Sequence, residues 1–188
     1  MRTALLAIGT ITALLTMAGC AQSLGRYNRP KVCESSNVSS SDALKDAPVW
    51  VPGSPMREGK PASGICGDGS LHLDRLCVVA EVADVTSTAQ AEGTLRKKTL
   101  RLLGEELDSR MRRIVGGATP ASELTDVSDQ LRDTIGQITD MWLSPNCVLY
   151  AVAEVERGDF DAVLRGPSLS NDAKTLLLDR AEEVIGPR

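Results

Sequence analysis

An apolar run of eight residues, Val148–Val155, constrains the fold of this chain more than any other feature. It reads Val-Leu-Tyr-Ala-Val-Ala-Glu-Val, a composition typical of a strand that is buried on both faces. The preceding segment 137–143 alternates between polar and apolar residues, as a strand does, and Ser144-Pro145-Asn146 between the two is a turn sequence. The two segments predict an antiparallel hairpin whose second strand is central in its sheet.

Much of the remaining chain has helical spacing. Apolar or small residues recur from about Leu73 to Val115, which predicts one long helix, with a break near Gly93 as an open alternative. The β-branched residues within 78–85 would equally support a strand. Gly116-Gly117 is expected to end this helix.

Three shorter helices are expected nearer the C-terminus. They span Ser122 to about Ile135, 159–164, and a final amphipathic segment that Ser170 caps. The apolar stripe of the last helix is expected to pack on the sheet of its own domain rather than on a partner. The predicted fold class is α+β, with a small, mostly antiparallel sheet packed against a long helix and shorter C-terminal helices.

The N-terminus has the three zones of a secretory signal. Arg2 supplies a positive charge, residues 4–17 are uncharged and largely apolar, and Ala18-Gly19 provides small side chains before Cys20. The 14 uncharged residues would extend about 21 Å as a helix, which is shorter than the roughly 30 Å core of a bilayer.

The tetrad Met17-Ala18-Gly19-Cys20 resembles a bacterial lipobox, with Met where Leu is usual. The resemblance implies that Cys20 is lipidated and becomes the first mature residue. Ala21 follows it, whereas Asp at that place is the inner-membrane retention signal of well-studied Gram-negative bacteria, so the outer membrane is the expected location. The alternative is a secreted protein that merely begins with Cys.

These features predict three parts of the chain. Residues 1–19 are expected to be a lipoprotein signal peptide, 20–46 the lipidated Cys20 and a Ser-rich tether, and 47–188 a single α+β domain. Trp50, between Pro48 and Pro52, is expected to insert into that domain. The chain is 42% hydrophobic and only 3% aromatic, so an aliphatic core is expected. A net charge of −4 argues against nucleic acid as a partner.

Four cysteines remain besides Cys20, namely Cys33, Cys66, Cys77 and Cys147. In an exported protein this even number favours up to two structural disulfides over a metal site or reactive thiols. The spacing leaves the connectivity open. A bridge from Cys33 would attach the tether to the domain.

Catalytic signatures are not found in the sequence. His72 is the single histidine and lies in no recognisable catalytic pattern. The segment Gly64-Ile65-Cys66-Gly67-Asp68-Gly69 lacks the residues of a phosphate-binding loop, so a short strand with a tight turn is expected there. We therefore predict no catalytic residues, no metal and no cofactor.

Several short motifs resemble the Lpp-twenty-like family of small bacterial outer-membrane lipoproteins. They are Pro48-Val49-Trp50-Val51, Gly64-Ile65-Cys66-Gly67, the segment 138–142 and the segment 149–155, over roughly residues 47–160. The family's usual Gly-Val-Gly is replaced here, and the four cysteines beyond Cys20 depart from its pattern. The resemblance implies an α+β fold, and Cys20 as the only site residue to carry over.

The expected function is that of a non-enzymatic envelope lipoprotein. It would be held to the membrane by lipid and would take part in an assembly with an envelope protein or peptidoglycan. The alternative is a periplasmic small-ligand-binding lipoprotein or a cryptic enzyme, which a deep apolar pocket with converging polar groups would favour.

Overall fold

The computed structural model describes residues 39–57, 59, 65–67, 69, 73–134, 136–166 and 169–186. Three strands carry the fold: β1 (Arg75–Val82), β2 (Gln137–Leu143) and β3 (Leu149–Glu156). The longer helices are α2 (Thr88–Val115), α3 (Ala121–Thr134), α4 (Arg157–Leu164) and α5 (Asn171–Asp179). The short ones are α1 (Ser40–Ala43) and α6 (Ala181–Val184), with 3-10 turns at Pro55–Arg57 and Gly116–Ala118. Helix α1 lies inside the range that we predicted to be tether.

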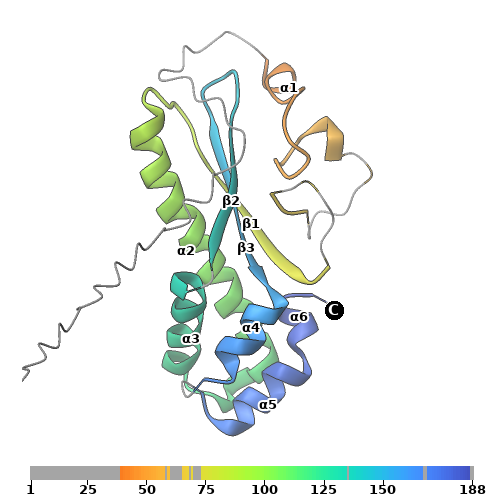
Figure 1. Cartoon of the computed structure of the whole chain (residues 1–188), viewed down its shortest axis with the longest axis vertical. Coiled ribbons are helices and arrows are strands. Elements are labelled where there is room, and N and C mark those ends of the chain that lie inside the picture. The colour runs from red at the N-terminus through yellow and green to blue at the C-terminus, as the bar shows by residue number, and fades with distance from the viewer. Residues whose placement is uncertain are drawn as a thin grey trace, which may run out of the picture.

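The strands form one antiparallel sheet in the order β1-β3-β2. The predicted hairpin of β2 and β3 is confirmed, and β3 is central and almost entirely buried. A bulge between Ile138 and Asp140 shifts the register of β2. The predicted fold class is confirmed, because this sheet packs against the long helix α2 and the shorter C-terminal helices (Figure 1).

The prediction of one helix from Leu73 to Val115 is wrong over its first part. Arg75–Val82 is strand β1, whose β-branched run pairs with β3 along its whole length. Asp84 then adopts a positive φ of 55°, and the helix begins only at Thr88. Periodicity failed here because a strand buried on both faces carries apolar residues at helical intervals as well. The break near Gly93 is absent, since α2 runs through it.

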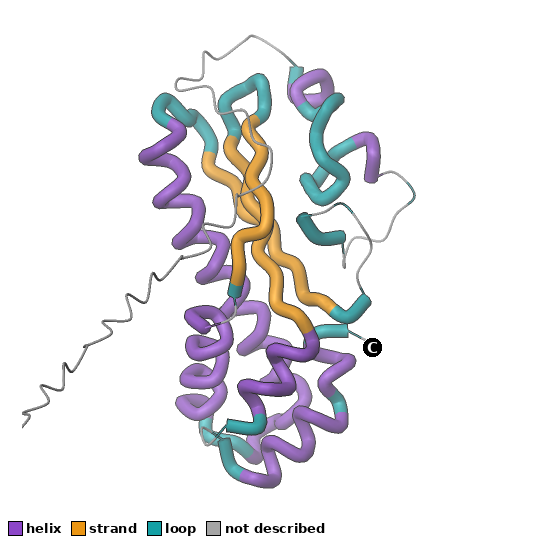
Figure 2. The backbone as a smooth tube through the Cα atoms, viewed as in Figure 1, coloured by secondary structure: helices purple, strands orange, loops and turns teal. Residues whose placement is uncertain are grey.

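Helix α2 packs along one face of the sheet (Figures 1 and 2). Alternate residues of β1, Leu76 and Ala80, point toward it, as do Ala151 and Ala153 of β3. The alanines let the helix approach the sheet closely, and Leu103 and Leu107 of α2 fill the interface with no exposed surface. This is the aliphatic core that the composition predicts.

The C-terminal end of α2 extends beyond the sheet, where α3 and the C-terminal helices pack around it. The Ser170 hydroxyl accepts a hydrogen bond from the backbone of Ala173, which confirms the predicted cap. The final helix stops at Arg180 and resumes as α6, with Leu177 and Val184 buried. The stripe packs on its own domain, as predicted, but it packs on α2 rather than on the sheet.

The opposite face of the sheet carries no long helix among the described residues. Residues of the segment 43–57, together with Ile65–Gly67, cover it instead (Figure 2). Trp50 is 1% exposed and packs in a second apolar cluster with Tyr150 and Val152 of β3. The insertion of Trp50 is therefore confirmed. Of the predicted strand at 64–67, Ile65 forms a single bridge, and Gly64 lies outside the described residues.

Candidate functional site

A groove of about 440 Å³ runs along the outer edge of β1. One wall of the groove is formed by α2, through Leu102, Glu106 and Arg110. The other wall is formed by the segment 43–57, through Trp50 and Arg57. Residues from both faces of β1 reach into it, which is expected because β1 is the edge strand of the sheet. The groove is therefore centred on the strand edge rather than on one face of the sheet.

The charged groups of the groove are already paired. Glu106 and Arg110 form an ion pair at 2.7 Å on α2, and Arg110 also donates to the carbonyl of Val184 at 2.8 Å. Arg57 donates to the carbonyl of Trp50 at 3.4 Å. Each charged side chain of the groove therefore already has a partner within the chain.

The backbone of β1 offers the hydrogen-bonding groups of the groove. The Arg157 amide donates to the Asp74 carbonyl at 2.9 Å, which assigns the even-numbered residues of β1 to pairing with β3. The N–H and C=O groups of the odd-numbered residues, such as Cys77 and Val79, then face outward. Lys98 of α2 donates to the carbonyl of Glu81 at 2.8 Å, in agreement with this alternation.

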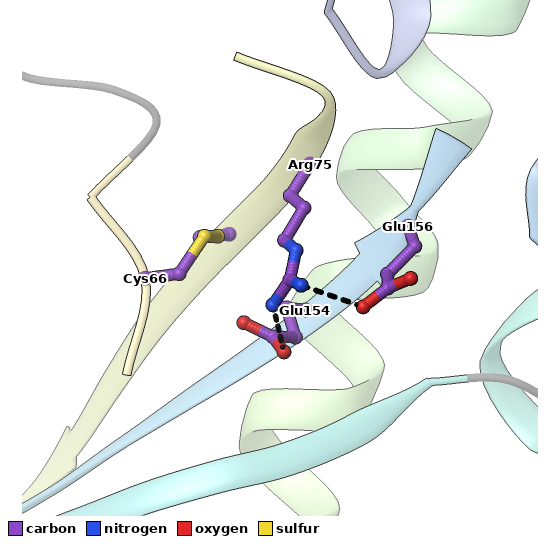
Figure 3. Close-up of a disulfide and its surroundings, with 5 residues drawn as sticks. Cys66, Arg75, Glu154 and Glu156 are labelled. Atoms are coloured by element: carbon purple, nitrogen blue, oxygen red, sulfur yellow. Dashed lines mark hydrogen bonds and ion pairs between the residues drawn. A yellow bond between two sulfur atoms is a disulfide. The ribbon is translucent and has the colours of Figure 1, made fainter. Parts of the chain in front are cut away.

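A disulfide between Cys66 and Cys77 joins the segment Ile65–Gly67 to β1, and the two Cα atoms are 5.5 Å apart. Figure 3 shows it beside Arg75, which bridges Glu154 at 3.0 Å and Glu156 at 2.8 Å. The two sulfur atoms and a carboxylate oxygen of Glu154 lie within 4.8 Å of one another. Thiolates are the metal-binding form of cysteine, so a metal could bind here only after the disulfide is reduced.

The carboxyl group of Asp140, on β2, is half-buried on the face of the sheet that residues 43–57 and Ile65–Gly67 cover. The indole nitrogen of Trp50 donates to Asp140 at 3.0 Å, and the Met141 amide donates to the same carboxyl at 2.8 Å. Burial raises the pKa of Asp140, and these two hydrogen bonds oppose that rise. A Cβ on Gly67 would lie 2.5 Å from the Thr139 hydroxyl, so only glycine allows this approach. The Thr139 hydroxyl is buried without a hydrogen-bond partner.

The predicted disulfide cysteines are only partly tested. Cys66 and Cys77 pair with each other. Cys147 is also disulfide-bonded, and its partner lies outside the described residues. Cys20, Cys33 and His72 lie outside the described residues too, so the predicted lipidation of Cys20 stays a prediction.

Sequence reasoning missed the cluster of Arg75, Glu154 and Glu156 and the contact between Trp50 and Asp140. Arg75 was placed on a helix, where its cross-strand partners could not be inferred. The signal that could have found it is the charge pattern itself, because Glu154 and Glu156 are alternate residues of a predicted strand.

Comparison with known proteins gives no relative. No protein-family model, no curated protein and no solved structure matches this chain. The resemblance to Lpp-twenty-like lipoproteins therefore stays a prediction from short motifs. Within the described residues, no helix is both long enough and apolar enough to cross a membrane.

Proposed function

We propose that this chain is a lipid-anchored envelope lipoprotein, of the Lpp-twenty-like kind, whose domain serves an assembly through protein contacts rather than catalysis. The outward-facing backbone of β1, in an open groove whose charged side chains already have partners within the chain, is the observation that carries this proposal. Such an edge can accept an extended segment of a partner. The signal sequence and Cys20 support the anchor and the outer-membrane location.

The anchor is tested by fractionating cells that express the full chain. The wild-type protein is expected to sediment with membranes, and Cys20→Ser is expected to be released, because no thiol remains to carry diacylglycerol. The double change Cys33→Ser and Cys147→Ser is the matched control, since it removes two cysteines outside the lipobox and leaves no unpaired thiol between them. Membrane association of Cys20→Ser would contradict the anchor.

The assembly role is tested by cross-linking in intact cells followed by mass spectrometry. A reproducible protein or peptidoglycan neighbour supports it, and a chain that cross-links to nothing contradicts it. Because neither result depends on Cys20, the two halves of the proposal can fail separately.

The disulfide pattern gives a second test of the lipid anchor. Cys66 and Cys77 are joined to each other, which leaves Cys20 and Cys33 as the other cysteines of the sequence that we consider as partners of Cys147. A lipidated Cys20 has no free sulfur, and the proposal therefore requires a Cys33–Cys147 bridge. Peptide mapping without reduction is expected to find that linked pair, and a Cys20–Cys147 peptide would exclude lipid on Cys20.

A small-ligand carrier is the second candidate, and the volume of the groove is the observation that favours it. A groove that holds a ligand would retain it when the purified protein is examined by native mass spectrometry. Leu102→Trp would fill the α2 wall and displace such a ligand. Equal masses for the native and the denatured chain would favour the assembly role.

A further inference from the structure

No described strand pairs with the outer edge of β1. Its outward-facing groups belong to Arg75, Cys77, Val79 and Glu81, and among the described residues only Lys98 contacts one of them. Val78 and Val79 are only partly buried at this edge. An eight-residue strand with free donors and acceptors is a template for another strand.

The sequence of β1 is complementary to itself in one antiparallel register. When Val78 lies opposite Val78 of a second copy, Cys77 lies opposite Val79 and Arg75 lies opposite Glu81. Odd-numbered residues then meet odd-numbered residues, so the outward N–H and C=O groups of both strands face each other. A shift of one residue would place outward groups opposite inward ones and lose this pairing.

The register that pairs the outward backbone groups also places opposite charges against each other. Arg75 and Glu81 are the charged residues of β1, and they lie near its two ends. Each would face its opposite charge on the second copy, at two places related by the symmetry axis. The Arg75 Nε is a buried donor without a hydrogen-bond partner, although the two terminal nitrogens of the same side chain are paired with Glu154 and Glu156.

We propose that two copies of this chain associate through antiparallel pairing of their β1 strands about Val78, which joins the two sheets into one continuous sheet. The proposal names a partner for the assembly role above and rests on that role. Lys98 covers one acceptor near the end of the edge, that of Glu81, and would release it on pairing. The groups of Cys77 and Val79 at the centre need no such release.

The test places a cysteine on the symmetry axis of the full chain, expressed in cells. Opposed residues that are not hydrogen-bonded in an antiparallel pair have Cα atoms about 4.5 Å apart, which a disulfide can span. Val78→Cys is therefore expected to give a covalent dimer on a non-reducing gel. Val82→Cys is the matched control, because it adds a thiol to the same face of the same strand but lies opposite Asp74 of the second copy rather than opposite another cysteine.

Residue 78 lies next to Cys77, so exchange with the Cys66–Cys77 bridge could also link two chains. Peptide mapping of the dimer without reduction is therefore expected to find the two introduced cysteines joined to each other. Equal dimer yields from Val78→Cys and Val82→Cys would overturn the proposal. A covalent adduct of Val78→Cys with a different protein would also overturn it, while the assembly role would stand. Wild-type and variant chains are compared for membrane association, which reports separately on the anchor.

A charge reversal provides a second test that needs no new cysteine. Glu81→Arg replaces two attractive contacts with two repulsive ones and is expected to weaken association of the full chain in detergent about tenfold. Glu81→Gln is expected to weaken it less. Glu182→Arg changes the net charge equally at an exposed site on α6 and is expected to leave association unchanged. Equal association of Glu81→Arg and wild-type chains would contradict the proposed register.

Discussion

The two faces of the sheet are covered in different ways. One face packs against α2 through close-fitting aliphatic side chains, and its elements contact one another along their lengths. The other face is covered by short loop segments, which are held by the buried Trp50, the Cys66–Cys77 disulfide and hydrogen bonds to Asp140. A helix satisfies its own backbone and contributes a regular apolar stripe, whereas a loop needs specific side chains to hold it in place.

The largest effect on stability is expected from Trp50→Ala. This change removes the largest buried side chain of the loop-covered face and is expected to lower the free energy of unfolding by about 4 kcal/mol. Urea unfolding followed by circular dichroism measures it. Trp50→Phe is the matched control, because it keeps most of the apolar surface and loses the hydrogen bond to Asp140. A loss for Trp50→Ala no larger than that for Trp50→Phe would show that packing of the indole is unimportant.

The helix-covered face is tested by Leu107→Ala, which leaves a cavity between α2 and its neighbours. Its cost is expected to be about 3 kcal/mol, measured by the same urea transition. Leu176→Ala is the control, since that leucine of α5 is 36% exposed and its removal should cost far less. Similar losses for the two leucines would mean that the α2 interface is loosely packed.

Removal of the disulfide by the double change Cys66→Ala and Cys77→Ala is expected to cost about 2–3 kcal/mol. The loop that it closes is short, and the expected effect follows from the entropy of that loop in the unfolded chain. In this background Trp50→Ala should cost less than in the wild type, because both changes loosen the same cluster, while Leu107→Ala should cost the same. Equal coupling to both faces would remove the distinction between them.

The smallest effect concerns pH. Burial raises the pKa of Asp140 in the folded protein, so folding favours its protonated form. This carboxyl therefore weakens the fold at neutral pH, and the weakening disappears as the pH falls through the raised pKa. Asp140→Asn keeps one acceptor oxygen, so it can accept from Trp50 or from the Met141 amide but not from both. Its stability relative to wild type is therefore expected to rise from acidic pH to pH 7, because only the wild type carries the cost of a buried charge. Urea midpoints at both pH values measure this, and a constant difference would contradict it.

The same contrast explains how much the sequence predicts. The hairpin of β2 and β3 and the cap at Ser170 follow from local patterns and are confirmed. Strand β1 was missed because its apolar run fits a helix as well as a strand, and only pairing with β3 decides between them. Its outward edge, and hence the candidate site, could not be predicted once β1 was taken for a helix.

The loop-covered face was harder still to predict. The burial of Trp50 follows from its residue type, but its contact with Asp140 joins residues 90 positions apart. The pairing of Cys66 with Cys77 was one of several connectivities that the spacing allowed. Contacts of this kind depend on where loops lie across a finished sheet, which no local pattern encodes.

The length of α2 determines how the protein can unfold locally. Its 28 residues extend about 42 Å, and it contacts both the sheet at one end and the C-terminal helices at the other. Neither half can separate without exposing the buried side of the same helix. Amide hydrogens along that side, from Leu95 to Met111, should therefore exchange with solvent at one common slow rate, as a single cooperative unit.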